Sequence, residues 1–349
     1  ELKNVMEPKL HTRHDPRVNF PEVGLFVPEI VIGIERNGQV AEVLHSKEGM
    51  EISWETILKI GKSIEGQCGL KSQEVLQFAA LTTQTQYLEQ VKQLQQHIIE
   101  GDCYEVNLAQ AFVAEGQLVD PVGSFLKLTA LSPVPFASFM RWENLYALCA
   151  SPERFLQLKE DRLISQPIKG TAPRSHDATI DASYKTHLQS SIKEQAENVM
   201  IVDLTRNDLH RSCETGSVQV PYLFEIQAFP QVFQMVSTVE GKKRPDISPY
   251  RVLENTFPPG SMTGAPKFRT MEIIDAIEPT ARGGYAGSMG YLNPEGGFDF
   301  NVIIRTLMYH AERQQLTYHV GGAITYDSDP EAEYEETLVK AKALKAVFG

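Results

Sequence analysis

Four glutamates at helical spacing are the residues of this 349-residue sequence that most suggest chemistry. Glu194 and Glu197 lie three apart in one predicted helix, and Glu333 and Glu336 lie three apart in another. Residues at that spacing share a helix face, where like charges cost roughly a few tenths of a kcal/mol. Either solvent or a bound cation would offset this repulsion. If the two pairs converge, their oxygens would suit Mg²⁺, but spacing alone leaves both interpretations open.

Two further residues have contexts that favour nucleophilic or acid chemistry. Lys169 stands at the end of a predicted strand beside Gly170 and Thr171. Burial would lower its pKa and make it a nucleophile, whereas a solvated lysine would have no such role. Glu153 follows a proline turn next to an apolar strand, and it is either a general acid with a raised pKa or a simple turn residue.

Arg305 lies within a predicted strand over residues 298–308, on the same face as Ile303 and Leu307. An arginine on such a face needs a partner. A bidentate contact with a substrate carboxylate and an internal ion pair both satisfy that requirement.

Glycine-rich sequence occurs in three segments, at residues 257–267, 282–291 and 320–323. None of them contains a dinucleotide-binding or Walker A pattern, so nucleotide binding has little support. They either bring backbone N–H groups close to an anionic substrate or form tight turns.

Charge and composition restrict the class of protein. The 33 Lys and Arg residues stand against 45 Asp and Glu residues, and the resulting net charge of −12 opposes binding to nucleic acid or to anionic membranes. No apolar run is long enough to span a membrane and no signal-peptide core is present, which predicts a cytoplasmic protein. The four cysteines form no CxxC pair, so buried free thiols are expected.

The elements that must position these residues mix hairpins with helices. Residues up to about 75 are short and β-like, two helices are predicted within 73–99, and a hairpin is predicted over 154–168. Helical sequence covers 183–213 and 330–348, and strands are predicted at 298–308 and 316–325. Because regular βαβ alternation is absent, the sequence predicts an α+β fold with antiparallel sheets.

Both acidic helices also have an apolar side. In the helix that carries Glu194 and Glu197, the apolar side is formed by Leu188, Ile192, Ala196 and Val199. In the last helix it is formed by Tyr334, Leu338, Ala341 and Phe348.

Taken in order, these segments resemble the chorismate-utilising enzymes over roughly residues 87–348. The matching motifs are GDCYEVNL at 101–108, ASPE at 150–153, PIKGT at 167–171, EQAEN at 194–198 with VDLTRNDL at 202–209, the segments 258–267 and 283–291, and GGA at 321–323 with DSDP at 327–330 and residues 333–340. The resemblance implies a four-layer α/β/β/α core with two packed antiparallel sheets. It further implies a shortened N-terminal subdomain over residues 1–84 and a chorismate-binding core over residues 85–349.

The resemblance also assigns site residues. Glu194, Glu197, Glu333 and Glu336 match the acidic Mg²⁺ site of the family, in which the ion holds the ring carboxylate of chorismate. Glu197 and Glu336 would be the direct ligands. The matching substrate contacts are Gly170, Thr171, Tyr285, Arg305, Gly321, Gly322 and Lys340.

Lys169 places the chain with one branch of this family. The aminodeoxychorismate synthases have a similar lysine, whereas anthranilate synthases typically read Pro-Ile-Ala-Gly-Thr. The resemblance implies that Glu153 acts as general acid for loss of the C4 hydroxyl while the Lys169 amine adds at C2, after which ammonia attacks C4 and expels the lysine. This scheme needs a neutral lysine, which desolvation under the substrate would favour despite the nearby acids.

Ammonia is expected to come from a glutamine amidotransferase subunit, because the chain has no Cys/His nucleophile motif. Isochorismate and salicylate synthases have a water-activating lysine where this chain has Glu105, which argues against water addition. Gln234 stands where family members usually have a histidine, and no element resembles the tryptophan site of anthranilate synthases. The alternatives are anthranilate synthase component I and a catalytically silent Mg²⁺-binding regulatory subunit.

Overall fold

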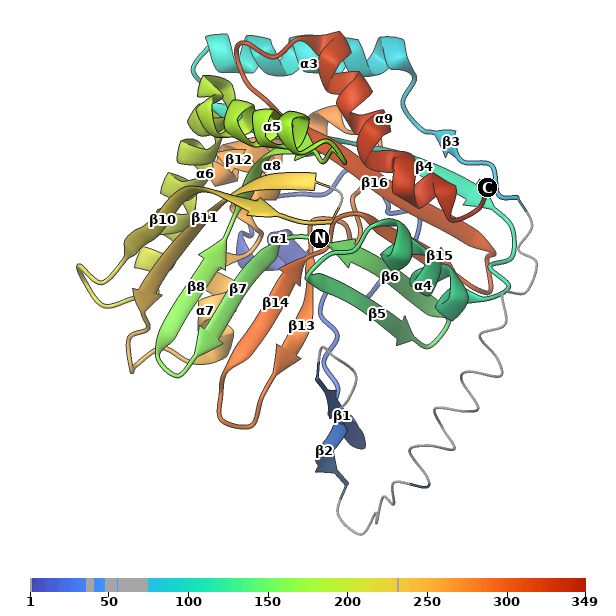
Figure 1. The fold of residues 1–349 in the computed structure, drawn as a ribbon, viewed down its shortest axis with the longest axis vertical. Coiled ribbons are helices and arrows are strands. Elements are labelled where there is room, and N and C mark those ends of the chain that lie inside the picture. The colour runs from blue at the N-terminus through green and yellow to red at the C-terminus, as the bar shows by residue number, and fades with distance from the viewer. Residues whose placement is uncertain (1, 36–40, 48–54, 56–74, 231) are drawn as a thin grey trace.

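Two seven-stranded antiparallel sheets form the framework of the protein (Figure 1). The computed structural model describes residues 2–35, 41–47, 55, 75–230 and 232–349. The first sheet runs in the order β10-β11-β8-β7-β14-β13, with β9 beside β11. Its strands are β7 (Arg154–Lys159), β8 (Arg162–Gln166), β9 (Ile168–Pro173), β10 (Gln219–Ala228), β11 (Val232–Lys242), β13 (Ser288–Leu292) and β14 (Phe298–Val302).

The second sheet runs in the order β12-β4-β16-β15-β6-β5, with β3 beside β4. Its strands are β3 (Ala79–Ala80), β4 (Glu105–Glu115), β5 (Phe136–Trp142), β6 (Leu145–Ser151), β12 (Gly264–Ala265), β15 (Thr306–His310) and β16 (Gln315–Ile324). The longest pairing joins β4 to β16 from Glu115 opposite Gln315 to Val106 opposite Ile324. This pairing fixes Glu105 and the glycines of β16 at the same end of the sheet.

Helices lie against both sheets and at their ends. They are α1 (Leu2–Met6), α3 (Gln84–Ile99), α4 (Pro121–Leu131), α5 (Ala178–Ser190), α6 (Ile192–His210), α7 (Pro249–Thr256), α8 (Lys267–Ile277) and α9 (Pro330–Ala346), with a short 3₁₀ turn, η1 (Gly260–Met262). Figure 1 shows α3, α5, α6 and α9 gathered at one end of the molecule, opposite the hairpin of β1 (Ile30–Ile34) and β2 (Ala41–Ser46).

Capping residues explain where the site-bearing helices begin. The Ser191 side chain accepts a hydrogen bond from the Glu194 backbone N–H and so starts α6, and Asp329 caps α9 in front of Pro330. Thr83 and Gln86 form a capping box at the start of α3. The helical sequence predicted over 183–213 is therefore two helices, because Ser191 is extended and both ends α5 and begins α6.

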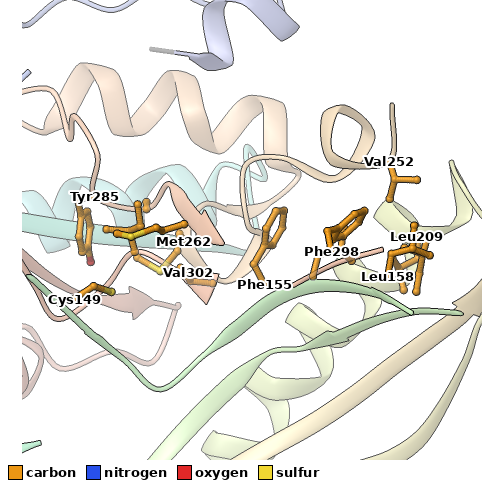
Figure 2. Packing of buried hydrophobic residues seen from close by; sticks show 14 of the residues in the cluster. Cys149, Phe155, Leu158, Leu209, Val252, Met262, Tyr285, Phe298 and Val302 are labelled. Atoms are coloured by element: carbon orange, nitrogen blue, oxygen red, sulfur yellow. The ribbon is translucent and has the colours of Figure 1, made fainter. Parts of the chain in front are cut away.

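The main hydrophobic core lies between the two sheets. It combines Phe155, Leu158 and Phe298 of the first sheet with Ala109, Cys149 and Met308 of the second. Figure 2 shows part of this cluster, with Tyr285 and Met262 beside Val302. Cys103, Cys149 and Cys213 are buried free thiols, as predicted, and Cys68 lies outside the described residues. Two packed antiparallel sheets flanked by helices confirm the predicted α+β class.

Two predicted elements are wrong. The first helix predicted within 73–99 does not form in the described part from residue 75 on, because Ala79 and Ala80 extend and pair with Val113 and Phe112 at the edge of β4. The continuous strand predicted over 298–308 is two strands in different sheets, since β14 ends at Val302 and β15 starts at Thr306.

Part of the N-terminal region packs onto the rest of the chain. Leu10 and Val18 are buried, and Pro16 forms an isolated bridge with Ala281. The subdomain boundary at residues 84/85 stays a prediction. Among the described residues, none of the helices is both long enough and apolar enough to cross a membrane.

Candidate active site

Lys169 and Glu105 form an ion pair that joins the two sheets. The Lys169 ammonium donates a hydrogen bond from Nζ on β9 to Oε1 of Glu105 on β4 at 2.7 Å. Their side chains are 10% and 1% exposed. Burial lowers the pKa of Lys169, but the carboxylates of Glu105 and Glu197 outweigh burial and raise it overall. Without substrate the lysine is therefore an ammonium, and it lies within β9 rather than at a strand end.

Glu153 is a buried carboxyl group beside this pair. Ser261 of η1 donates a hydrogen bond from Oγ to Oε1 of Glu153 at 2.6 Å. Burial raises the pKa of Glu153 to about 7, although the Ser261 hydrogen bond and the charges of Lys169 and Arg305 oppose the rise. A carboxyl group with that pKa still carries its proton near neutral pH and can donate it. The structure therefore favours the general-acid interpretation over a simple turn residue.

The acidic face of α6 points into the protein, and Ile192 and Val199 of the predicted apolar side point out, whereas Leu188 of that side belongs to α5 and is buried. Glu197 is buried, and burial raises its pKa to about 7 despite the nearby Lys169. Burial followed by the charge of Glu336 raises the pKa of Glu194. Ile192 and Val199 are 83% and 47% exposed. The solvated-face interpretation is therefore wrong for the acidic side of α6.

The glutamates of α9 approach those of α6. Glu333 is buried and accepts a hydrogen bond from Ser328 Oγ at 2.9 Å. Lys193 Nζ lies 3.4 Å from Glu333 Oε1 and 3.9 Å from Glu197 Oε1, so this lysine of α6 bridges the two helices. The two acidic pairs therefore converge, which spacing alone left open.

Glu336 and Lys340 complete the α9 side of the site. Glu336 is half-exposed and pairs with Lys340 at 2.7 Å. Burial favours a higher pKa for Glu336, but its ion pair with Lys340 outweighs burial and lowers the pKa. Lys340 also donates a hydrogen bond to the Gly321 carbonyl at 2.8 Å, which fastens α9 to β16.

Two glycines leave open the space toward which the carboxylates point. A Cβ at Gly322 would lie 3.3 Å from Glu333 Oε2 and 3.7 Å from Glu336 Oε1. A Cβ at Gly170, whose φ is +83°, would lie 2.9 Å from Glu194 Oε2. A side chain at either position would crowd these oxygens, so glycine is needed at both.

The donor set fits Mg²⁺. Within the described residues, the group whose ligand atoms come within 4.8 Å of one another is His97, Glu100 and Asp102, and the glutamates of α6 and α9 are spread more widely. Mg²⁺ keeps several waters and binds one or two carboxylates together with substrate oxygens, so it does not require a closed protein cage. Glu197 and Glu336 present such oxygens from opposite helices.

Arg305 lies in the connection between β14 and β15, with a left-handed φ of 51°. The described residues offer its guanidinium no carboxylate within ion-pair distance, and burial lowers its pKa while Glu153 opposes that change. The internal ion pair considered from the sequence is therefore absent from the described structure, and the role of Arg305 in binding a substrate carboxylate stays a prediction. Its predicted place on one face of a continuous strand is wrong.

Two other predicted site residues, Thr171 and Tyr285, lie in different surroundings. Thr171 is exposed on β9 and lies opposite Gln234 of β11, whose buried side-chain oxygen has no hydrogen-bond partner among the described residues. Tyr285 is buried in the core and stacks on His319 with ring centroids 5.2 Å apart. Tyr285 also lines a separate cavity of about 770 Å³ beneath residues 3–25, so its place in the site stays a prediction.

Sequence reasoning missed three polar residues that hold the site. Ser261 orients Glu153, Ser328 orients Glu333, and Lys193 bridges α6 to α9. Ser261 lies in the glycine-rich segment 257–267, whose pattern predicts only a tight turn or backbone N–H groups close to an anionic substrate. Lys193 precedes Glu197 by four residues, a spacing that predicts a helical ion pair.

Known proteins are similar to this chain in sequence and in fold. Residues 1–346 match the family described as chorismate binding enzyme. The chain is 43% identical over 262 residues to aminodeoxychorismate synthase component 1 of Escherichia coli, covering 75% of this chain and 57% of that protein. It is 42% identical over 275 residues to the chloroplastic aminodeoxychorismate synthase of Arabidopsis thaliana, covering 78% of this chain and 30% of that protein.

A solved structure agrees with the fold. The crystal structure of anthranilate synthase component I from Streptococcus pneumoniae superposes with a TM-score of 0.82 at 28% identity, covering 98% of this chain and 78% of that one. The chain thus spans between about a third and just over half of the length of the two curated relatives.

Proposed function

The chain belongs to the chorismate-binding enzyme family, and from this we propose that it converts chorismate and ammonia to 4-amino-4-deoxychorismate, the precursor of para-aminobenzoate in folate biosynthesis. The names of the two curated relatives support this branch of the family. The observation that carries the proposal is a buried lysine, Lys169, in electrostatic contact with a buried acid, Glu153, whose pKa is about 7.

Glu153 supplies the proton for the leaving group. The C4 hydroxyl of chorismate departs as water when Glu153 protonates it, and the hydrogen bond from Ser261 holds the carboxyl group in place. Because the pKa of Glu153 is about 7, the acid form persists at neutral pH, and turnover should decline as the pH rises above about 7.

Lys169 is the nucleophile in this proposal. Its neutral amine adds at C2 as the hydroxyl leaves, and ammonia then attacks C4 and expels the amine. The hydroxyl at C4 is thus replaced by nitrogen in two additions, first of lysine at C2 and then of ammonia at C4. No direct displacement at C4 is required. An anthranilate-forming enzyme has no need of this lysine.

The substrate carboxylates would be held by residues that lack an internal partner. The Arg305 guanidinium is buried and has no carboxylate within ion-pair distance in the described chain. Gly170 and Gly322 leave space beside Glu194 and Glu333 for the substrate. A bound Mg²⁺, held by Glu197 and Glu336, would act as a template for the ring carboxylate and withdraw electrons from it.

Ammonia is proposed to come from a glutamine amidotransferase subunit. The name "component 1" of the Escherichia coli relative supports a partner for that protein. The 349-residue chain alone should therefore turn over chorismate with ammonium salts and not with glutamine.

The decisive experiment incubates the chain with chorismate, Mg²⁺ and ammonium. Anthranilate is followed by its fluorescence, and aminodeoxychorismate is followed as para-aminobenzoate after adding a lyase. Para-aminobenzoate that disappears in Lys169→Ala supports the proposal. Anthranilate as the main product would place the chain in the other branch, and no product at all would indicate a silent subunit.

The Lys169→Ala variant also separates chemistry from binding. If Lys169 is the nucleophile, kcat should fall sharply while the KM for chorismate changes little, because binding depends on other residues. A lysine that only neutralises a substrate carboxylate would instead raise KM and spare kcat. Mass spectrometry of the intact protein should find a trapped adduct on Lys169 that the variant lacks.

A further inference from the structure

Glu105 is a buried carboxylate with only half of its hydrogen-bonding capacity used. Its side chain is 1% exposed, and Oε1 accepts the hydrogen bond from Lys169 Nζ at 2.7 Å. Its other oxygen, Oε2, is buried and has no hydrogen-bond partner in the described part of the chain. Leaving a buried charged oxygen unpaired is unfavourable, so this arrangement calls for a functional explanation.

The strand that carries Glu105 contacts Lys169 directly and is linked to Glu153 through Ser261. Asn107, two residues along β4, donates a hydrogen bond from Nδ2 to the Ser261 carbonyl at 3.3 Å. Ser261 in turn donates to Glu153. Since residues two apart in a strand share a face, β4 positions the nucleophile through Glu105 and supports the acid through Asn107.

Several carboxylates surround Lys169, and one of them, Glu105, is hydrogen-bonded to it. Glu153 precedes β7, Glu194 and Glu197 project from α6, Glu336 projects from α9, and each interacts electrostatically with the lysine. Among the described residues, Glu105 is the carboxylate within hydrogen-bond distance of Nζ. A proton leaving Nζ therefore has a direct acceptor at 2.7 Å.

We propose that Glu105 is the proton acceptor for Lys169: it takes one proton from the ammonium as chorismate binds and returns it when the lysine is expelled. This inference rests on the proposed function, because it assigns a base to the lysine nucleophile of that reaction. Glu105 touches the reacting nitrogen and is therefore a catalytic residue in this scheme.

The protons balance over one turnover. An N–H bond of Lys169 breaks and an O–H bond forms on Glu105, which leaves a neutral amine. The amine adds at C2 while Glu153 gives its proton to the departing hydroxyl, so water leaves and Glu153 becomes a carboxylate. Ammonia then bonds to C4, the C2–N bond breaks, Glu105 returns its proton to the lysine, and the new C4 ammonium gives a proton to Glu153.

The first test compares Glu105→Gln with Glu105→Asp in the ammonia-dependent assay. The amide of Gln can still hydrogen-bond to Lys169 but cannot take its proton. At pH 7 we expect kcat to fall on the order of 10²-fold relative to the wild type, with little change in KM. This ratio to the wild type should narrow as the pH is raised and solvent deprotonates the lysine, because loss of the Glu153 proton lowers kcat in both proteins alike. Asp keeps a carboxylate and should lie between Gln and the wild type.

A matched control is Glu272→Gln on α8, which removes a partly exposed carboxylate paired with Arg269, away from the site, and should leave kcat unchanged. Equal kcat in Glu105→Gln and the wild type at every pH would overturn the proposal. A loss of kcat that is the same at every pH would also overturn it, because the carboxylate would then only hold the lysine in place.

The second test needs no substrate and reports on Lys169 directly. Labelling with acetic anhydride, read by mass spectrometry of the Lys169 peptide, gives the pH at which the amine becomes reactive. In Glu105→Gln that midpoint should fall by at least about one pH unit. Burial lowers the pKa of Lys169, and the variant removes the carboxylate that contributes most to raising it. An unchanged midpoint would overturn the assignment.

The two tests also distinguish this inference from the proposed function. Wild-type protein that makes no aminodeoxychorismate, together with a shifted labelling midpoint, refutes the proposed reaction and leaves the proton pair intact. Wild-type protein that makes the product, together with an unshifted midpoint, refutes the role of Glu105 alone. Thermal unfolding of each variant checks that the fold is retained.

Discussion

Helices α3 and α6 have similar lengths but bury different kinds of residue. In α3, the apolar residues Tyr87, Val91 and Leu94 are buried, as their helical spacing predicts. In α6, Glu197 and Asp208 are buried while Ile192 is 83% exposed. The buried side of α3 is apolar, whereas the buried side of α6 combines these acids with apolar residues such as Ile201 and Leu209.

The difference separates residues that stabilise the fold from residues that serve the site. Burying Leu94 removes apolar surface from water, which favours folding. Burying Glu197 raises its pKa to about 7, which shows that its charged form is unfavourable there in the absence of a cation. A buried carboxylate of that kind reduces stability, and in the proposed function a bound cation would offset this cost.

The largest effect is expected from Glu197→Ala in α6. Turnover should fall by more than about 100-fold, because loss of even an outer-shell partner of a metal site costs 10–100-fold. The melting temperature should stay the same or rise, since the substitution removes a buried charge. Steady-state kinetics, calorimetric Mg²⁺ titration and thermal unfolding measure the three quantities.

Helix α9 supplies the matching pair for this experiment. Glu336→Ala should lose turnover as Glu197→Ala does, but it also removes the ion pair with Lys340 and should not raise the melting temperature. Its exposed neighbour Glu335→Ala should leave activity unchanged. Full activity in the presence of a chelator would contradict the assignment of both glutamates.

Leu94→Ala in α3 should have the reverse signature. Truncating a fully buried leucine should lower the free energy of unfolding by about 2–5 kcal/mol, measured by urea denaturation. The kcat of the folded protein should not change. Gln93→Ala, one residue away on the exposed side, is the control, and a drop in kcat without a loss of stability in Leu94→Ala would undermine the comparison.

The stability of the protein should depend on pH through its buried acids. Glu153 has a pKa of about 7 in the folded protein against 4.5 as its ordinary value, so the folded state keeps its proton over a range where the unfolded state loses it. Stability should therefore fall as the pH rises from about 4.5 to about 7, by on the order of 1–3 kcal/mol for this group.

Glu153→Gln should flatten that dependence, because the amide resembles the protonated acid and carries no charge at any pH. The measurement is the free energy of unfolding against pH with a chelator present, and Glu197 should add a slope of the same sign. An unchanged slope in Glu153→Gln would argue against a raised pKa.

The smallest effect is expected at Ile192, on the outward side of α6. Ile192→Ser should change the free energy of unfolding by no more than about 0.5 kcal/mol, because the side chain is already 83% exposed. A loss of several kcal/mol in urea denaturation would mean that this side of α6 is covered in solution.

Local sequence patterns were enough to predict the α+β class, the hairpin of β7 and β8, and the helices α3 and α9. These features depend on local information. Hydrophobic periods of 2 and 3.6 identify strands and helices, and capping residues such as Asp329 mark where a helix begins.

Only the tertiary structure decided which face of α6 turns inward. Periodicity tells which residues share a face, but burial of a polar face depends on partners distant in sequence, such as Lys169 for Glu197 and Lys193 for Glu333. The break at Arg305 has the same origin, because neighbouring strands in the chain joined different sheets. The pairing of Lys169 with Glu105, 64 positions apart, arises only when those sheets pack, since no local pattern links residues at that separation.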